Sequence, residues 1–70
     1  MRIIYKIYEE RTKQKLSVRQ LSAKSGVSKT QINDIENGNK HPTVYVLCLL
    51  SLALNVDPCS LFEMSVIADK

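Results

Sequence analysis

The sequence predicts an all-α fold of five short helices in one compact domain, residues 1–70. Apolar residues recur at the three- and four-residue spacing of one helix face over most of the chain. Ser, Thr or Asp precedes four of the five predicted helices, as expected of N-cap residues. Only two glycines and two prolines occur in 70 residues, and they lie between the predicted helices or at their ends. A chain of this length forms one domain with a small core.

The first helix is expected over residues 2–13. Ile4, Ile7, Tyr8 and Arg11 follow the i, i+3, i+4, i+7 spacing that places side chains on one helix face.

The second and third helices are expected over residues 18–25 and 29–36. Ser17 and Ser28 are their N-cap candidates, and a Gln three residues after Ser17 completes the pattern of a capping box. Gly26 falls where a chain leaving a helix often takes a positive φ angle. Two short helices joined by a tight turn with a glycine are typical of a helix-turn-helix.

The third helix has two different faces. Ile32 and Ile35 are three residues apart and share the apolar face. The other face is polar and consists of Lys29, Thr30, Asn33 and Asp34.

The fourth helix is expected over residues 44–54, after an N-cap at Thr43, and only Ser51 in it is not hydrophobic. A helix that is apolar all round is normally buried all round. A 70-residue domain can hardly bury such a helix alone, and an exposed apolar patch usually marks an interface.

The fifth helix is expected over residues 58–63, with Asp57 as N-cap and Pro58 at the first helical position. Leu61 and Phe62 are expected to return to the core. The tail, residues 64–70, still carries apolar side chains, so it either extends this helix or pairs across a dimer.

Charge is distributed unevenly along the chain. Residues 1–42 hold nine Lys or Arg against four Asp or Glu, whereas residues 43–70 hold one against three. The basic part contains the helix-turn-helix, which favours a polyanion as its partner. A solvated basic surface without a partner remains the alternative.

Other classes of function have little support. Cys48 and Cys59 are eleven residues apart and His41 is the only histidine, so no zinc pattern, cofactor or metal site is predicted, and both thiols are expected to be reduced. No nucleophile–base spacing or glycine-rich phosphate loop indicates an enzyme. The longest apolar run is too short to span a membrane, and no signal peptide is recognisable, so a cytoplasmic protein without membrane contact is expected.

Residues 3–62 resemble the phage repressor and Cro family of bacterial helix-turn-helix regulators, which implies a lambda-repressor-like DNA-binding fold. The residues that carry the resemblance are Leu16-Ser17, Leu21-Ser22, Ser25-Gly26-Val27-Ser28, Ile32, Ile35-Glu36-Asn37-Gly38, Pro42-Thr43, Leu47, Leu50, Leu54-Asn55-Val56-Asp57-Pro58 and Leu61-Phe62.

The resemblance also implies structural roles. It implies an ion pair between Arg11 and Glu36, which would tie the first helix to the end of the third. Many family members have Gly where this chain has Lys15, so Lys15 must take a left-handed conformation or end the helix differently. The inward face of the fourth helix would consist of Val44, Leu47, Leu50, Ser51 and Leu54.

The resemblance places the third helix in the major groove of double-stranded DNA. The base-reading residues would be Lys29, Thr30, Asn33 and Asp34. Lys29 can donate to guanine, Asn33 can pair with adenine and Asp34 can accept from cytosine N4. The residues expected to contact phosphates are Ser17, Arg19, Ser28, Gln31, Asn37 and Lys40.

Family members usually bind inverted repeats as dimers, so the leading hypothesis is a homodimeric transcription regulator, a repressor. The dimer interface is expected to include Tyr45, Leu49, Leu52, Met64, Val66 and Ile67. The alternative is an antitoxin or another protein-interaction module on the same fold, with a protein partner on the outer face of residues 44–54.

Overall fold

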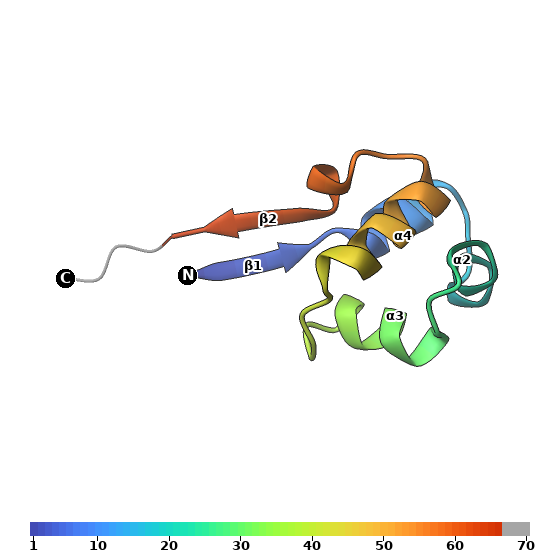
Figure 1. Cartoon of the computed structure of the whole chain (residues 1–70), viewed down its shortest axis with the longest axis horizontal. Helices are drawn as coiled ribbons and strands as arrows, with labels where there is room; N and C mark the ends of the chain where they lie inside the picture. Colours follow the sequence, from blue (N-terminus) through green and yellow to red (C-terminus); the bar gives the residue numbers. More distant parts are fainter. Residues whose placement is uncertain (67–70) are drawn as a thin grey trace.

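The structure, a computed structural model, describes residues 1–66, which form four α-helices, one 3₁₀ turn and one two-stranded sheet. The elements in chain order are β1 (Arg2–Tyr5), α1 (Ile7–Lys13), α2 (Val18–Ser25), α3 (Lys29–Glu36), α4 (Val44–Leu54), the 3₁₀ turn η1 (Pro58–Leu61) and β2 (Phe62–Ser65). The helices gather at one end of the molecule, and the two strands project from them side by side (Figure 1).

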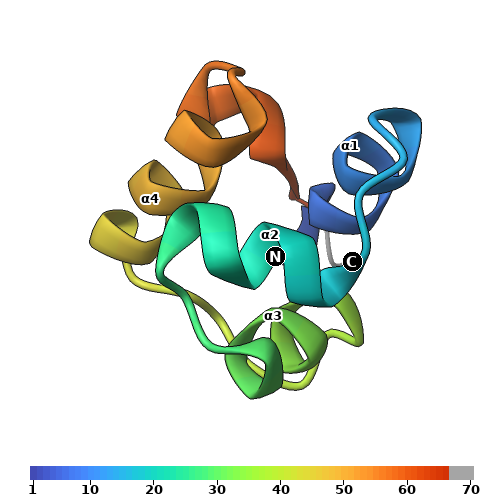
Figure 2. The ribbon, with the colours of Figure 1, turned by 90° about the vertical axis from the view of Figure 1, so that its right-hand side faces the viewer.

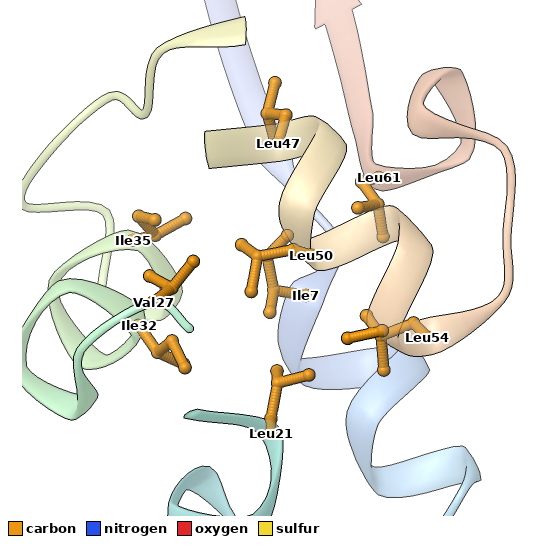
Figure 3. Packing of buried hydrophobic residues seen from close by; sticks show 10 residues of the cluster. Ile7, Leu21, Val27, Ile32, Ile35, Leu47, Leu50, Leu54 and Leu61 are labelled. Atoms are coloured by element: carbon orange, nitrogen blue, oxygen red, sulfur yellow. The ribbon is translucent and has the colours of Figure 1, made fainter. Parts of the chain in front are cut away.

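The core lies where the four helices and η1 meet (Figure 3). Its buried residues are Ile7, Leu21, Val27, Ile32, Ile35, Leu47, Leu50, Ala53, Leu54 and Leu61. Every helix and η1 contributes at least one of them, so a single small cluster holds all these elements together. Within residues 1–66, every buried side-chain nitrogen or oxygen atom has a hydrogen-bond partner.

Local capping explains where three helices begin. The hydroxyl of Ser17 accepts from the Gln20 N–H at 3.0 Å, and the Gln20 side chain accepts from the Ser17 N–H at 2.8 Å, so α2 begins with a complete capping box. The Ser28 hydroxyl accepts from the Gln31 N–H and caps α3. The Thr43 hydroxyl accepts from the Val46 N–H and caps α4, and both distances are 3.1 Å. The ranges of these three helices coincide with those expected from the sequence.

The expected first helix begins later than the sequence suggested, because residues 2–5 form β1 and only Ile7–Lys13 is helical. β1 is rich in β-branched and aromatic residues, which favour strands. It pairs antiparallel with β2, and the Lys6 N–H donates to the Leu61 carbonyl at 2.7 Å. These hydrogen bonds with a distant segment outweigh the local helical spacing. Lys15, two residues after the end of α1, has its backbone in the left-handed region, at φ 60°.

The prediction of a fifth helix over residues 58–63 is wrong. Pro58–Leu61 forms only a 3₁₀ turn, with the Asp57 side chain accepting from the Cys59 N–H at 2.8 Å, and Phe62–Ser65 is the second strand. Residues 62–65 therefore do not extend a helix. Leu61 is fully buried, but Phe62 is 37% exposed and does not return to the core. The fold is consequently helical with a small sheet rather than all-α.

The inward face of α4 differs from the expected one at its first residue. Leu47, Leu50, Ser51 and Leu54 are buried, whereas Val44 is 76% exposed. Val44 lies at the start of α4, before the helix reaches the core. Among residues 1–66, no helix has the length and apolar character that crossing a membrane requires.

We call β1 and β2 together the ribbon. The register pairs Ile3 with Met64 and Tyr5 with Phe62. The Lys6 ammonium lies 3.3 Å from the Glu63 carboxylate, next to the strands. The molecule measures 45 × 22 × 21 Å, and the ribbon extends along its longest dimension (Figure 1).

Candidate nucleic-acid interface

α2, the turn and α3 form a helix-turn-helix, with α2 at the end of the molecule opposite the ribbon (Figure 1) and α3 beneath it (Figure 2). Gly26 ends α2 at φ 79°, and its N–H donates to the Ser22 carbonyl at 2.9 Å. The Ser25 hydroxyl accepts from the Val27 N–H at 3.1 Å, and the Val27 side chain is buried. The positive φ angle of Gly26 and the buried Val27 therefore fix the angle at which α3 leaves α2.

The two faces of α3 separate as its sequence suggests. Ile32 and Ile35 are buried in the core. The side chains that remain exposed are Lys29, Thr30, Gln31 and Asn33, and Asp34 is half-buried. The exposed polar face combines donors and acceptors in a length of two turns, which suits the pattern of groups that a DNA major groove presents.

The beginning of α3 has unused backbone donors. The Gln31 N–H donates to the Ser28 hydroxyl and the Ile32 N–H to the Ser28 carbonyl. The N–H groups of Lys29 and Thr30 belong to the first turn, which has no intrahelical acceptor for them. These groups and the helix dipole together favour an anion at this end of α3.

Asp34 is paired within the chain. Its carboxylate lies 3.9 Å from the Lys40 ammonium, which comes from the loop after α3. The Asp34 side chain is 27% exposed and the Lys40 side chain 70% exposed. The pair reduces the repulsion that Asp34 would exert on a phosphate, and it brings a predicted base reader next to a predicted phosphate contact.

The other predicted phosphate contacts lie on three segments. Ser17 and Arg19 are exposed at the start of α2, Ser28 and Gln31 at the start of α3, and Asn37 at the C-terminal end of α3. The Ser17 N–H donates to Gln20, so the donors left at this end of α2 are those of the following residues. The start of α3 and the loop after α3 thus flank the polar face of α3.

Arg11 of α1 and Glu36, the last residue of α3, form a bidentate ion pair. Arg11 Nε lies 2.8 Å from one Glu36 oxygen and Nη2 lies 3.0 Å from the other, while Nη1 donates to the Leu16 carbonyl at 2.9 Å. The side chains are 11% and 8% exposed. The hydrogen bond to Glu36 raises the pKa of Arg11, against the opposing effect of burial.

Two contacts near the site were not expected from the sequence. The Tyr5 hydroxyl lies 2.8 Å from His41 Nδ1, which ties β1 to the loop between α3 and α4. The Tyr8 ring lies 5.2 Å from the Arg11 guanidinium carbon, in a cation–π contact. Tyr8 and Arg11 are three residues apart on one helix, so spacing could have revealed the second contact. No local signal predicts the first, because 36 residues separate its partners.

The residues expected at a dimer interface lie on two separate elements. Tyr45 and Leu52 on α4 are 71% and 79% exposed, and Leu49 is half-buried against the core. Met64 in β2 is 58% exposed, and Val66 just after the strand is 72% exposed. The remaining expected interface residue, Ile67, lies outside the described residues.

Residues 1–66 include both cysteines of the chain. Cys48 is half-buried on α4 and Cys59 is exposed in η1, and both are free thiols. Residues 1–66 contain no group of three His, Cys, Asp or Glu side chains that could hold a metal ion.

Comparison with known proteins relates the chain to one family. The family model for helix-turn-helix domains matches residues 7–61. No curated protein sequence matches.

Two solved structures share the fold. The restriction-modification controller protein C.AhdI from Aeromonas hydrophila has a TM-score of 0.74 at 26% identity, over 77% of this chain and 82% of that one. A candidate DNA-binding protein from Bacteroides fragilis has a TM-score of 0.79 at 22% identity, over 89% of this chain and 100% of that one. The chain belongs to the helix-turn-helix family of the phage repressor and Cro type, a family of DNA-binding transcription regulators.

Proposed function

We propose that this protein is a sequence-specific transcription repressor that binds an inverted-repeat operator as a homodimer, with α3 in the major groove. The observation that carries the proposal is the structure of α3, whose polar side chains are exposed on one face while Ile32 and Ile35 anchor the other in the core. A helix held in this way can present its side chains to base edges without losing its position.

Base reading is assigned to the exposed face of α3. Lys29 donates to guanine O6 or N7, Thr30 contacts a thymine methyl or offers its hydroxyl, and Asn33 pairs with adenine. Asp34 accepts from cytosine N4, and its ion pair with Lys40 limits the approach of its charge to a phosphate.

Phosphate contacts would fix the position of α3 in the groove without reading sequence. The exposed cation Arg19 would contact phosphates beside α2, and Lys40 beside the end of α3. The first-turn N–H groups of α3, with Ser28 and Gln31 beside them, add uncharged donors. The Arg11–Glu36 pair supports these contacts indirectly, because it holds the end of α3 against α1.

Repression needs only DNA binding. A dimer on an operator that overlaps a promoter excludes the polymerase from the same DNA. C.AhdI, a chain of similar length with the same fold, is a restriction-modification controller protein, and this supports a regulatory role here.

Selection from a random duplex DNA pool with the purified protein, at physiological salt, tests the proposal. We expect an enriched inverted repeat with half-sites about 10 bp apart, centre to centre. A reporter with that site across its promoter should then lose expression when the protein is present. Binding that fades steeply with salt and enriches no sequence would mean phosphate contact alone and would contradict the proposal.

A protein-interaction module, such as an antitoxin, is the second candidate function. The exposed apolar side chains of Tyr45 and Leu52 on α4 favour it, because large exposed apolar residues usually mark an interface. Tight binding to the product of a neighbouring gene, combined with weak binding to every DNA sequence, would make it the leading function.

A further inference from the structure

The ribbon has one face that is apolar at every strand position. Residues directly opposite each other in an antiparallel pair lie on the same face. The register therefore places Ile3, Met64, Tyr5 and Phe62 together, and we call these four residues the ribbon face. The opposite face carries the other paired residues, which are Arg2, Ile4, Glu63 and Ser65.

The described part of the chain leaves the β2 half of the ribbon face uncovered. Met64 is 58% exposed and Phe62 is 37% exposed, while Ile3 and Tyr5 are half-buried. The ribbon projects from the helices (Figure 1), and β1 lines one pocket with the C-terminal end of α3. An isolated two-stranded ribbon is marginally stable in water and needs a third strand or a packing partner. We therefore expect a partner molecule to cover the ribbon face.

We propose that the partner is a second copy of this chain, which packs its own ribbon face against this one across a two-fold axis. The inference rests on the homodimer of the proposed function and identifies its interface. It assigns the dimer contact to the ribbon rather than to the C-terminal part of α4, where Leu52 lies.

Charge favours a second copy over a nucleic acid at this surface. The ribbon face carries no charged side chain, and Glu63, which pairs with Lys6 at 3.3 Å, lies on the opposite face. Two copies can therefore approach through the ribbon without strong repulsion. α2 lies at the end of the molecule away from the strands (Figure 1), so the first helix of the helix-turn-helix stays away from the contact. The aromatic and Met side chains of the ribbon face are of the types enriched in interface cores.

The area that a stable dimer needs indicates how far the interface extends. A standard interface buries about 800 Å² per partner and involves about 20–30 residues on each side. The two strands supply eight residues, so neighbouring residues must contribute. The Tyr5–His41 hydrogen bond places the base of the ribbon near the segment that leads into α4. There Val44 and Tyr45 are 76% and 71% exposed, and we include them in the interface.

Sedimentation equilibrium of the full chain without DNA tests the inference on one residue of each face of the ribbon. Met64→Lys places a charge on the ribbon face, whereas Ile4→Lys places the same side chain on the opposite face, across from Glu63. We expect a dimer for the unmodified chain and for Ile4→Lys, and a dissociation constant at least about 100-fold higher for Met64→Lys. Such a loss is of the size seen when an interface residue of central importance is changed.

A second pair of measurements covers the other outcomes. Leu52→Lys, on the 79% exposed outer position of α4, should leave the dimer intact. If Met64→Lys prevents folding, as judged by circular dichroism, Met64→Thr replaces it and should still weaken the dimer at least tenfold.

Three results would overturn the inference. Equal weakening by Met64→Lys and Ile4→Lys would indicate pairing of strand edges, and dissociation by Leu52→Lys alone would place the interface on α4. A monomer at every concentration would remove the interface altogether. The proposed regulatory function is tested separately, because a monomer that still selects one DNA sequence would remain a sequence-specific DNA-binding protein.

Discussion

Arg11 joins more parts of the structure than any other polar residue described above. Its guanidinium donates to both oxygens of Glu36 and to the Leu16 carbonyl, and the Tyr8 ring lies beside it. These contacts connect α1 with the end of α3 and with the segment that leads into α2. The position of the proposed recognition helix therefore depends on one side chain outside the helix-turn-helix.

Arg11→Met should lower the free energy of unfolding by about 3–5 kcal/mol, because it leaves the Glu36 carboxylate buried without its partner. Urea denaturation measures this change. The matched control is Lys13→Met, which removes an exposed pair with Glu10 at 3.4 Å and should change stability by less than about 1 kcal/mol. An effect as small as that of the control would show that the Arg11–Glu36 pair contributes little.

Lys15 has a backbone conformation that favours glycine, with φ at 60°. A non-glycine residue there costs roughly 1–2 kcal/mol, and Lys15→Gly removes this cost. Part of the gain in stability is lost again because glycine has greater freedom in the unfolded chain. Lys15→Gly should therefore raise the melting temperature by a few degrees, as calorimetry can measure. Lys15→Ala keeps the unfavourable φ angle and should give no such rise. If both variants raised it equally, the Lys15 side chain rather than the backbone would be responsible.

At the scale of elements, α3 combines a core face with a polar face, and substitutions on the two faces should have different effects. Lys29→Ala combined with Thr30→Ala should remove the preference for the selected operator and leave the fold intact. Each good base contact contributes about 1–3 kcal/mol of discrimination, so each of the two substitutions should lower specificity about 5- to 150-fold. Competition binding with operator and scrambled DNA measures the change.

Lys24→Ala is the control for this double variant, because Lys24 is exposed on α2 rather than on α3. It should leave the preference for the operator unchanged. An unchanged preference in the double variant would instead show that other residues read the bases.

At the scale of the whole molecule, phosphate contacts should appear in the salt dependence of binding. Arg19→Gln should reduce the slope of log K against log salt concentration by about 1, uniformly for all DNA sequences. Lys13→Gln on α1, where Lys13 pairs with Glu10, should leave the slope unchanged. Equal slopes for Arg19→Gln and the unmodified protein would remove Arg19 from the set of phosphate contacts.

The sequence by itself determined the helix-turn-helix and α4. Their signals are local: Ser17, Ser28 and Thr43 cap the helices, Gly26 makes the turn, and the apolar spacing of α3 defines its core face. The polar face of α3 could be named for the same reason, since a helix of known start and known inner face has a known outer face. Its base-reading role rested on the resemblance to the phage repressor and Cro family.

Only the tertiary structure decided the ends of the chain. β1 and β2 form because Ile3 meets Met64 and Tyr5 meets Phe62 across nearly the whole length of the chain. Local signals favoured a helix in both segments, through apolar spacing in residues 2–13 and through Asp57 and Pro58 in residues 58–63. Such signals contain no information about a pairing between distant strands. The hydrogen bond between Tyr5 and His41 arises in the same way. Strand pairing is a contact between distant residues, so its stabilisation becomes visible only when both segments are placed in space.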